Sequence, residues 1–66
     1  MYLPRLRDLR EDHDMTQAQI AAILGIDQRV YSIYDTGKRD IPLPHLVTLA
    51  DYYKVSTDYL LGREKS

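Results

Sequence analysis

The side chains best suited to recognising another molecule lie together in the middle of the chain. Gln28, Arg29, Ser32 and Ile33 share the outward side of one predicted helix. A glutamine amide can make a bidentate contact to adenine and an arginine guanidinium one to guanine, each worth about 1–3 kcal/mol of discrimination. An α-helix fits the DNA major groove and presents its N-terminal residues to the base edges. Hydrogen-bonded recognition of another molecule is therefore the chemistry open to these residues, and the base edges of DNA are one partner that they fit.

No residues are arranged for catalysis or for binding a metal. The two histidines, His13 and His45, lie far apart in the sequence, and neither has a second carboxylate or a thiol at ligand spacing. The three glycines are isolated, so no glycine-rich loop can hold a phosphate. The absence of cysteine rules out a disulfide or a thiolate metal site. We therefore expect no enzyme, metal, cofactor or small-molecule substrate.

Length and composition describe one small folded domain. A chain of 66 residues buries only about 60% of its unfolded surface, which leaves no room for a separate catalytic or ligand domain. Hydrophobic residues make up 44% and charged residues 29%, which indicates a folded chain rather than a disordered one. No apolar run approaches the roughly 20 residues of a membrane span, and residues 1–5 lack the long apolar h-region of a signal peptide. We expect a cytoplasmic protein.

Net charge argues weakly against a nucleic-acid partner. The formal charge is −1 and the isoelectric point is about 6.0, whereas nucleic-acid modules are often strongly basic. The distribution of charge matters more than its sum, because Arg29, Lys38 and Arg39 lie in or just after the recognition stretch. With the arginines of the first ten residues they predict a basic face on an acidic body. Such a protein should bind random DNA weakly and with strong salt dependence.

Residues 16–35 are predicted to position the recognition residues on the second of two short helices. An apolar helical stripe ends at Gly25, because glycine takes the left-handed C′ conformation without a steric penalty. Asp27 is a good N-cap for the next helix, in which Tyr31 and Tyr34 face inward. Two helices joined by a short turn that contains glycine form a helix-turn-helix.

Three more helices complete an all-α fold, a compact bundle of five short helices. The predicted helices cover residues 4–13, 17–24, 28–36, 44–53 and 57–61. In the fourth, apolar side chains at spacings of 3, 4 and 7 form a core stripe, namely Leu46, Leu49, Ala50 and Tyr53. We expect residues 1–62 to form the domain and residues 63–66 a flexible tail.

Several short motifs follow one another along nearly the whole chain. They are Leu6-Arg7-Asp8-Leu9-Arg10, Met15-Thr16-Gln17, Ala21-x-x-Leu24-Gly25, Tyr31-Ser32-x-Tyr34-Asp35-x-Gly37-Lys38-Arg39, Leu49-Ala50-Asp51-Tyr52-Tyr53 and Asp58-Tyr59-Leu60-Leu61-Gly62. In this order and at these spacings they resemble the phage lambda repressor-like (Cro/C1, also called XRE) DNA-binding domains. The resemblance implies that the helix over residues 28–36 reads double-stranded DNA.

The resemblance also implies phosphate contacts on both sides of the recognition helix. Gln17 falls in the first turn of its helix, where free backbone N–H groups favour an anion. Thr16 precedes it and is expected to form a capping box with Gln19. The residues expected at phosphates are Thr16, Gln17, Thr36, Lys38 and Arg39. Thr36 stands where the family more often has arginine or asparagine, so its contact should be weaker.

Two side chains have alternative interpretations. Arg10 lies on the core-facing side of the first helix, and the family pattern predicts a structural ion pair between Arg10 and Asp35. The alternative is that Arg10 extends from the edge of that face to solvent. Ile33 stands where relatives commonly carry a polar or basic residue. It would either meet a thymine methyl group or be an ordinary exposed residue.

The resemblance implies a sequence-specific transcriptional regulator, and a repressor rather than an activator. Such domains usually bind as two-fold dimers to half-sites about 34 Å apart. Tyr59 and Leu61 form the candidate dimer surface, since the core does not need both. A protein-interaction module that binds a toxin or a larger regulator is the alternative, favoured by an exposed Ile33 and the acidic isoelectric point.

Overall fold

The computed structural model describes residues 2–63. These residues form the α-helices α1 (Pro4–Asp12), α2 (Gln17–Leu24), α3 (Gln28–Asp35), α4 (Leu43–Tyr53) and α5 (Thr57–Leu60), with no strand among them. The all-α bundle predicted from the sequence is confirmed. Of the predicted tail, residues 64–66 lie outside the described residues.

The predicted helices differ from the observed ones by a residue at some ends. Predicted ends at His13, Thr36 and Leu61 fall on the C-cap residues of α1, α3 and α5. A C-cap residue is half in the helix, which is why a sequence pattern places the end there. The fourth helix begins at Leu43 instead of Pro44.

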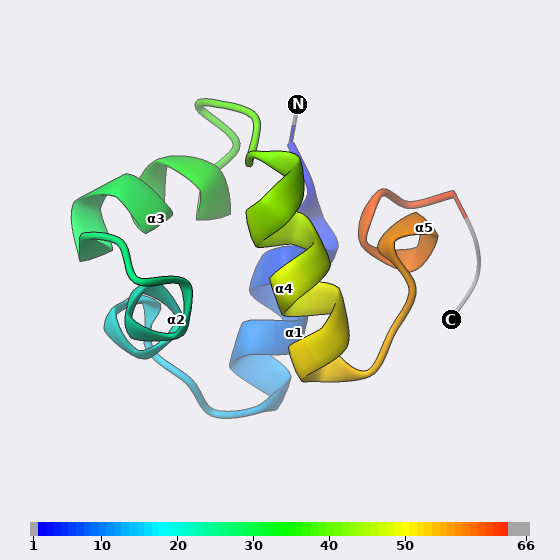
Figure 1. Ribbon diagram of the computed structural model, residues 1–66, viewed down its shortest axis with the longest axis horizontal. Helices are drawn as coiled ribbons and strands as arrows, with labels where there is room; N and C mark the ends of the chain where they lie inside the picture. Colours follow the sequence, from blue (N-terminus) through cyan, green and yellow to red (C-terminus); the bar gives the residue numbers. More distant parts are fainter. Residues whose placement is uncertain (1, 64–66) are drawn as a thin grey trace.

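The helices surround α4, which runs through the middle of the bundle (Figure 1). The helix-turn-helix of α2 and α3 lies on one side of α4 and α5 on the other. α2 packs against α3, while α1 contacts both α3 and α5 and so connects the two sides. One face of the helix-turn-helix is therefore buried, and the other is left for a partner.

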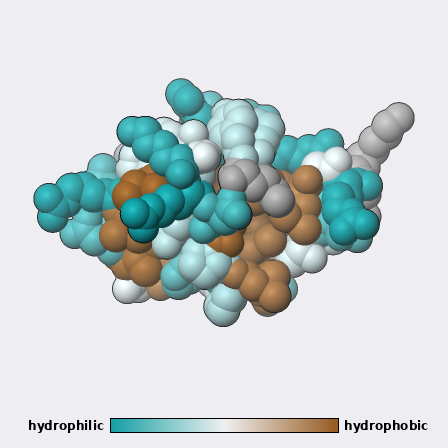
Figure 2. Space-filling view, turned by 90° about the horizontal axis from the view of Figure 1, so that it is seen from above, coloured by the Kyte–Doolittle hydropathy of each residue, from teal (hydrophilic) through white to brown (hydrophobic). Residues whose placement is uncertain are grey.

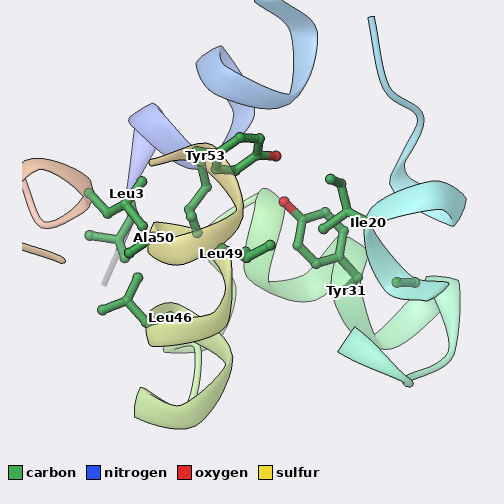
Figure 3. Close-up of a cluster of buried hydrophobic side chains, with 10 residues drawn as sticks. Leu3, Ile20, Tyr31, Leu46, Leu49, Ala50 and Tyr53 are labelled. Carbon is green, nitrogen blue, oxygen red and sulfur yellow. The ribbon is translucent and has the colours of Figure 1, made fainter. Parts of the chain in front are cut away.

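The core is built mainly from α4 and the residues that face it. The predicted stripe of α4 is buried as expected. Figure 3 shows Leu49 of this stripe beside Tyr31 of α3, which in turn lies beside Ile20 of α2. Leu3 is also buried, although it precedes the first helix and belongs to no periodic pattern. Among residues 2–63, the buried hydrophobic core consists of Leu3, Leu6, Ile20, Ala21, Tyr31, Leu46, Leu49, Ala50, Tyr53 and Leu60.

Each described helix ends in the same kind of turn. A residue with positive φ follows the helix, and the next N–H donates to the carbonyl five residues earlier. This bond satisfies a carbonyl of the last turn that has no partner within the helix. The positive-φ residues are Asp14, Gly25, Gly37, Lys54 and Gly62. The turns can therefore be short, and only three residues separate α2 from α3.

Candidate nucleic-acid interface

Side-chain caps define where both helices of the helix-turn-helix begin. The Gln19 N–H donates to Thr16 Oγ1 at 3.1 Å, and the Thr16 N–H donates to Gln19 Oε1 at 2.8 Å. This is the predicted capping box. Asp27 caps α3, because its Oδ1 accepts the Arg29 N–H at 2.8 Å. Both helices therefore start at a fixed residue, which sets the register of the recognition side chains.

Asp35, the last residue of α3, is the one charged side chain that is buried among residues 2–63, at 1% exposed. Its Oδ1 accepts from Arg10 Nε at 3.3 Å and from the Tyr31 hydroxyl at 2.9 Å. Its Oδ2 accepts from Arg10 Nη2 at 3.2 Å and from Gln17 Nε2 at 3.1 Å. The ion pair expected between Arg10 and Asp35 is present, and it lies inside a larger network.

This network connects α1, α2 and α3 at one point. Arg10 also donates from Nη1 to the Met15 carbonyl at 2.9 Å, which fixes the turn that leads into α2. Burial raises the pKa of the Tyr31 hydroxyl far above its ordinary value, and the Asp35 charge adds to the rise. Tyr31 therefore remains a protonated donor. A buried carboxylate with this set of partners holds the recognition helix in a single orientation.

The residues predicted to read bases lie along the solvent side of α3. Gln28 and Arg29 are exposed, and the Arg29 side chain is 92% exposed. Ser32 and Ile33 are half-buried. The outer side of the first turn of α3 is thus open to a partner, whereas that of the second turn is partly enclosed.

The residues predicted to contact phosphate differ in how free their donors are. Lys38 and Arg39 are exposed in the loop after α3. Gln17 is half-buried, and its amide nitrogen is bonded to Asp35. The Thr36 hydroxyl donates to the Ser32 carbonyl at 2.8 Å. Sequence reasoning missed the Gln17 contact because it joins residues from two different helices.

The arginines of α1 do not add to a basic face in the way that the sequence suggested. The Arg5 guanidinium lies 4.3 Å from the centre of the Tyr59 ring and donates to the Tyr59 carbonyl at 2.7 Å. Arg7 pairs with Glu11 at 3.3 Å. Arg10 is taken up by the Asp35 network. Arg5 also covers one half of the candidate dimer surface, while Leu61 packs against the core.

The N-terminal segment supports the loop that carries Lys38 and Arg39. Tyr2 lies against Gly37, and a Cβ atom built on Gly37 would meet Tyr2 Cδ1 at 2.7 Å, Cβ at 2.8 Å and Cα at 3.0 Å. Gly37 is therefore required for close approach as well as for its φ of +79°. No sequence signal could have indicated this contact, because Tyr2 precedes every predicted element.

Across residues 2–63, no group of three His, Cys, Asp or Glu side chains is placed to hold a metal ion. None of the helices described there has the length and apolar character needed to cross a membrane.

The fold and this site together define a helix-turn-helix DNA-binding domain. The sequence model of the Helix-turn-helix family matches residues 6–60. The chain belongs to this family, in its phage lambda repressor-like (XRE) form, as the motifs of the sequence predicted.

Similar proteins carry names of the same kind. An uncharacterised HTH-type transcriptional regulator of Bacillus subtilis, YobD, is 45% identical over 62 residues, which cover 94% of this chain and 55% of the relative. The HTH-type transcriptional regulator AnsR of the same organism is 40% identical over 65 residues, covering 98% and 56%. The CTXphi transcriptional repressor RstR of Vibrio cholerae is 37% identical over 59 residues, covering 89% and 53%.

A solved structure shows the same fold. The crystal structure of a transcriptional regulator from Listeria innocua matches with a TM-score of 0.89 at 27% identity, covering 100% of this chain and 62% of that one. This chain spans about half the length of the curated relatives that it matches. What it shares with them is the DNA-binding domain.

We expect loss of the Asp35 carboxylate to unfold much of the protein. Asp35→Ala leaves the partly buried Arg10 charge without its carboxylate, which costs about 3–5 kcal/mol, comparable with the ~3–10 kcal/mol stability of a domain this small. Tyr31→Phe removes one hydrogen bond to a charged group and should cost about 1.5–3 kcal/mol. Urea denaturation followed by circular dichroism measures both. Equal midpoints for Asp35→Ala and the parent would show that the network does not stabilise the fold.

The Tyr2 contact predicts that two glycines with similar backbone geometry respond differently to alanine. Gly25→Ala should cost about 1–2 kcal/mol from left-handed strain alone, because its Cβ meets nothing within 4 Å. Gly37→Ala adds the clash with Tyr2 and should melt at a lower temperature. In a Tyr2→Gly background the gap should shrink. Thermal melts of the four variants test this, and equal losses at the two glycines would contradict it.

Proposed function

We propose that this chain binds a specific double-stranded DNA operator as a homodimer and represses transcription, with α3 in the major groove. The observation that carries the proposal is the division of α3 into two faces. Tyr31 and Asp35 are buried and fix the helix, while Gln28 and Arg29 are exposed at its N-terminal end. The N-terminal end of a recognition helix is the part that meets base edges. Gln28 and Arg29 would read bases, with Ser32 and Ile33 contributing from the second turn.

Phosphate contacts would come from both ends of the helix-turn-helix. Lys38 and Arg39 supply exposed cations just after α3, and backbone contacts of this kind position a protein without reading sequence. Thr16 is exposed at the start of α2, where backbone N–H groups attract an anion. Gln17 would hold α2 in place through the N–H that it donates to Asp35, and the second N–H of the same amide would donate to a phosphate.

Repression is supported by the kind of relatives found. RstR is named a transcriptional repressor, and a domain that occupies an operator can block transcription through occupancy alone. A protein with this role would act in the cytoplasm, where bacterial DNA lies.

A dimer is supported by exposed hydrophobic side chains at the start of α4. Leu43 is 66% exposed and Val47, one turn later, is 42% exposed. Leu43 borders a hollow of about 230 Å³, which is lined by Leu3, Asp40, Ile41, Leu43, Leu46 and Leu61. Figure 2, which looks onto this end of the molecule, shows hydrophobic surface gathered there. Leu61 of the candidate dimer surface thus belongs to the apolar patch, whereas Tyr59 is covered by Arg5.

The size of the domain limits the strength of such a dimer. A standard interface buries roughly 800 Å² on each partner, which would be nearly a fifth of the 4333 Å² of accessible surface. Only two large hydrophobic side chains, Leu43 and Val47, are exposed on the described part of the chain at the start of α4. We therefore expect the domain to dimerise weakly in solution and to pair on DNA, where two adjacent half-sites raise the local concentration.

Selection from random duplexes at physiological salt tests base reading directly. We expect a palindrome with half-sites about one helical turn apart. Arg29→Ala should fold normally and lose about 1–3 kcal/mol of preference at one position of each half-site. Lys38→Ala should weaken binding to all sequences. It should also reduce the slope of log affinity against log salt concentration by about 1, the value for one phosphate contact. Lys54→Ala, at the far end of α4, is the charge control. A bound pool without an enriched motif would favour the protein-interaction module instead.

The dimer surface predicts a variant that binds half-sites normally and palindromes poorly. Leu43→Ser combined with Val47→Ser removes apolar surface without changing charge, and should lose roughly tenfold or more of the palindrome's advantage. Tyr52→Ser removes an exposed hydrophobic residue from the opposite end of α4 and serves as the control. Fluorescence anisotropy with single and paired half-sites measures the difference. If both variants keep the full palindrome advantage, dimerisation uses another surface.

A further inference from the structure

Asp27 has a second contact beyond its capping bond. The oxygen that accepts the Arg29 N–H, Oδ1, also lies 3.4 Å from Arg29 Nε. One carboxylate oxygen thus binds the backbone and the side chain of the same residue. The backbone bond fixes the Asp27 carboxylate at the start of α3. The carboxylate therefore gives the exposed Arg29 side chain a fixed partner.

The contact uses the part of Arg29 that base recognition leaves free. A guanidinium reads guanine through two parallel N–H groups, which donate to the acceptor atoms O6 and N7. With Nε directed at Asp27, the two terminal nitrogens remain available on a side chain that is 92% exposed. A long side chain loses freedom when it is immobilised at an interface. If Asp27 already restricts the Arg29 side chain in the free protein, less conformational freedom is lost on binding DNA. The contact between Asp27 and Arg29 therefore favours guanine recognition.

The charge of Asp27 has the opposite effect on non-specific binding. A carboxylate at the DNA-facing end of α3 repels phosphate, and affinity for random DNA depends chiefly on phosphate contacts. The carboxyl group is ionised at neutral pH, as aspartates ordinarily are, and the hydrogen bond from the Arg29 backbone lowers the pKa of Asp27 further. Exposed ion pairs contribute little to folding. The ion pair of Asp27 with Arg29 would therefore act on the choice of sequence more than on stability, whereas the capping bond stabilises α3.

We propose that Asp27 is a specificity-determining residue, which positions the Arg29 guanidinium for a guanine and opposes binding to random DNA. This inference rests on the proposed function, since it requires α3 to read bases. It predicts that a single substitution raises affinity for random DNA while it lowers preference at one operator position. A residue that merely capped the helix would not produce both effects.

The test uses Asp27→Ser, because serine caps a helix as well as aspartate does but lacks the carboxylate. The selected operator is compared with a duplex changed at the position where Arg29→Ala loses its preference, and with a random duplex. We expect Asp27→Ser to melt close to the parent, to bind random DNA more tightly and to lose about two- to tenfold of guanine preference. Asp40→Ser removes another exposed carboxylate near Lys38 and Arg39. It should raise random binding and leave base preference unchanged.

A double-mutant cycle separates positioning from direct reading. In the Arg29→Ala background, Asp27→Ser should no longer change base preference. If Asp27→Ser keeps the full guanine preference, or lowers preference equally with and without Arg29, the inference is overturned. Failure of the proposed function would look different, because the parent protein itself would then show no preferred sequence.

Discussion

The buried carboxylate of Asp35 is the constraint on which the rest of the structure depends. A charge inside a small domain is tolerated only when its hydrogen-bonding capacity is met. Meeting it requires a guanidinium from α1, an amide from the start of α2 and a hydroxyl from α3 itself. The relative placement of the three helices follows from this requirement. A hydrophobic core alone would allow α3 to slide or rotate, because apolar contacts have no direction.

The recognition surface is a consequence of fixing the inner face of α3. This helix has eight residues, with Asp27 capping its first turn and Asp35 closing its last. Both of its ends are therefore tied by carboxylates, one exposed and one buried. The side chains between them project from a helix whose register and tilt are set. Rigid placement of this kind is what direct reading of base edges needs.

Local patterns predicted much of this structure, and contacts between distant residues were the part they could not supply. The helix caps, the glycine turns and the α4 stripe each depend on residues within a few positions, so they can be read from sequence. The Arg10–Asp35 pair was expected only through family resemblance. The contacts of Gln17 with Asp35, of Arg5 with Tyr59 and of Tyr2 with Gly37 depend on the assembled bundle. The first of these uses one of the two N–H groups of an amide that the sequence had assigned to phosphate, and the second places a guanidinium over the ring of a residue assigned to a dimer surface.

The shared way in which the helices end also bears on how this sequence can change. Three of the left-handed positions hold glycine, but Asp14 and Lys54 adopt the same conformation with a side chain. Each carries a steric penalty, and the acidic Asp14 adds an unfavourable charge at the negative end of the α1 dipole, whereas Lys54 is favourable at the end of α4. Natural proteins rarely occupy their stability optimum. Substitutions at these two turns could therefore raise the stability of the fold. Such a gain would offset destabilising changes on the DNA-facing surface as operator preference evolves.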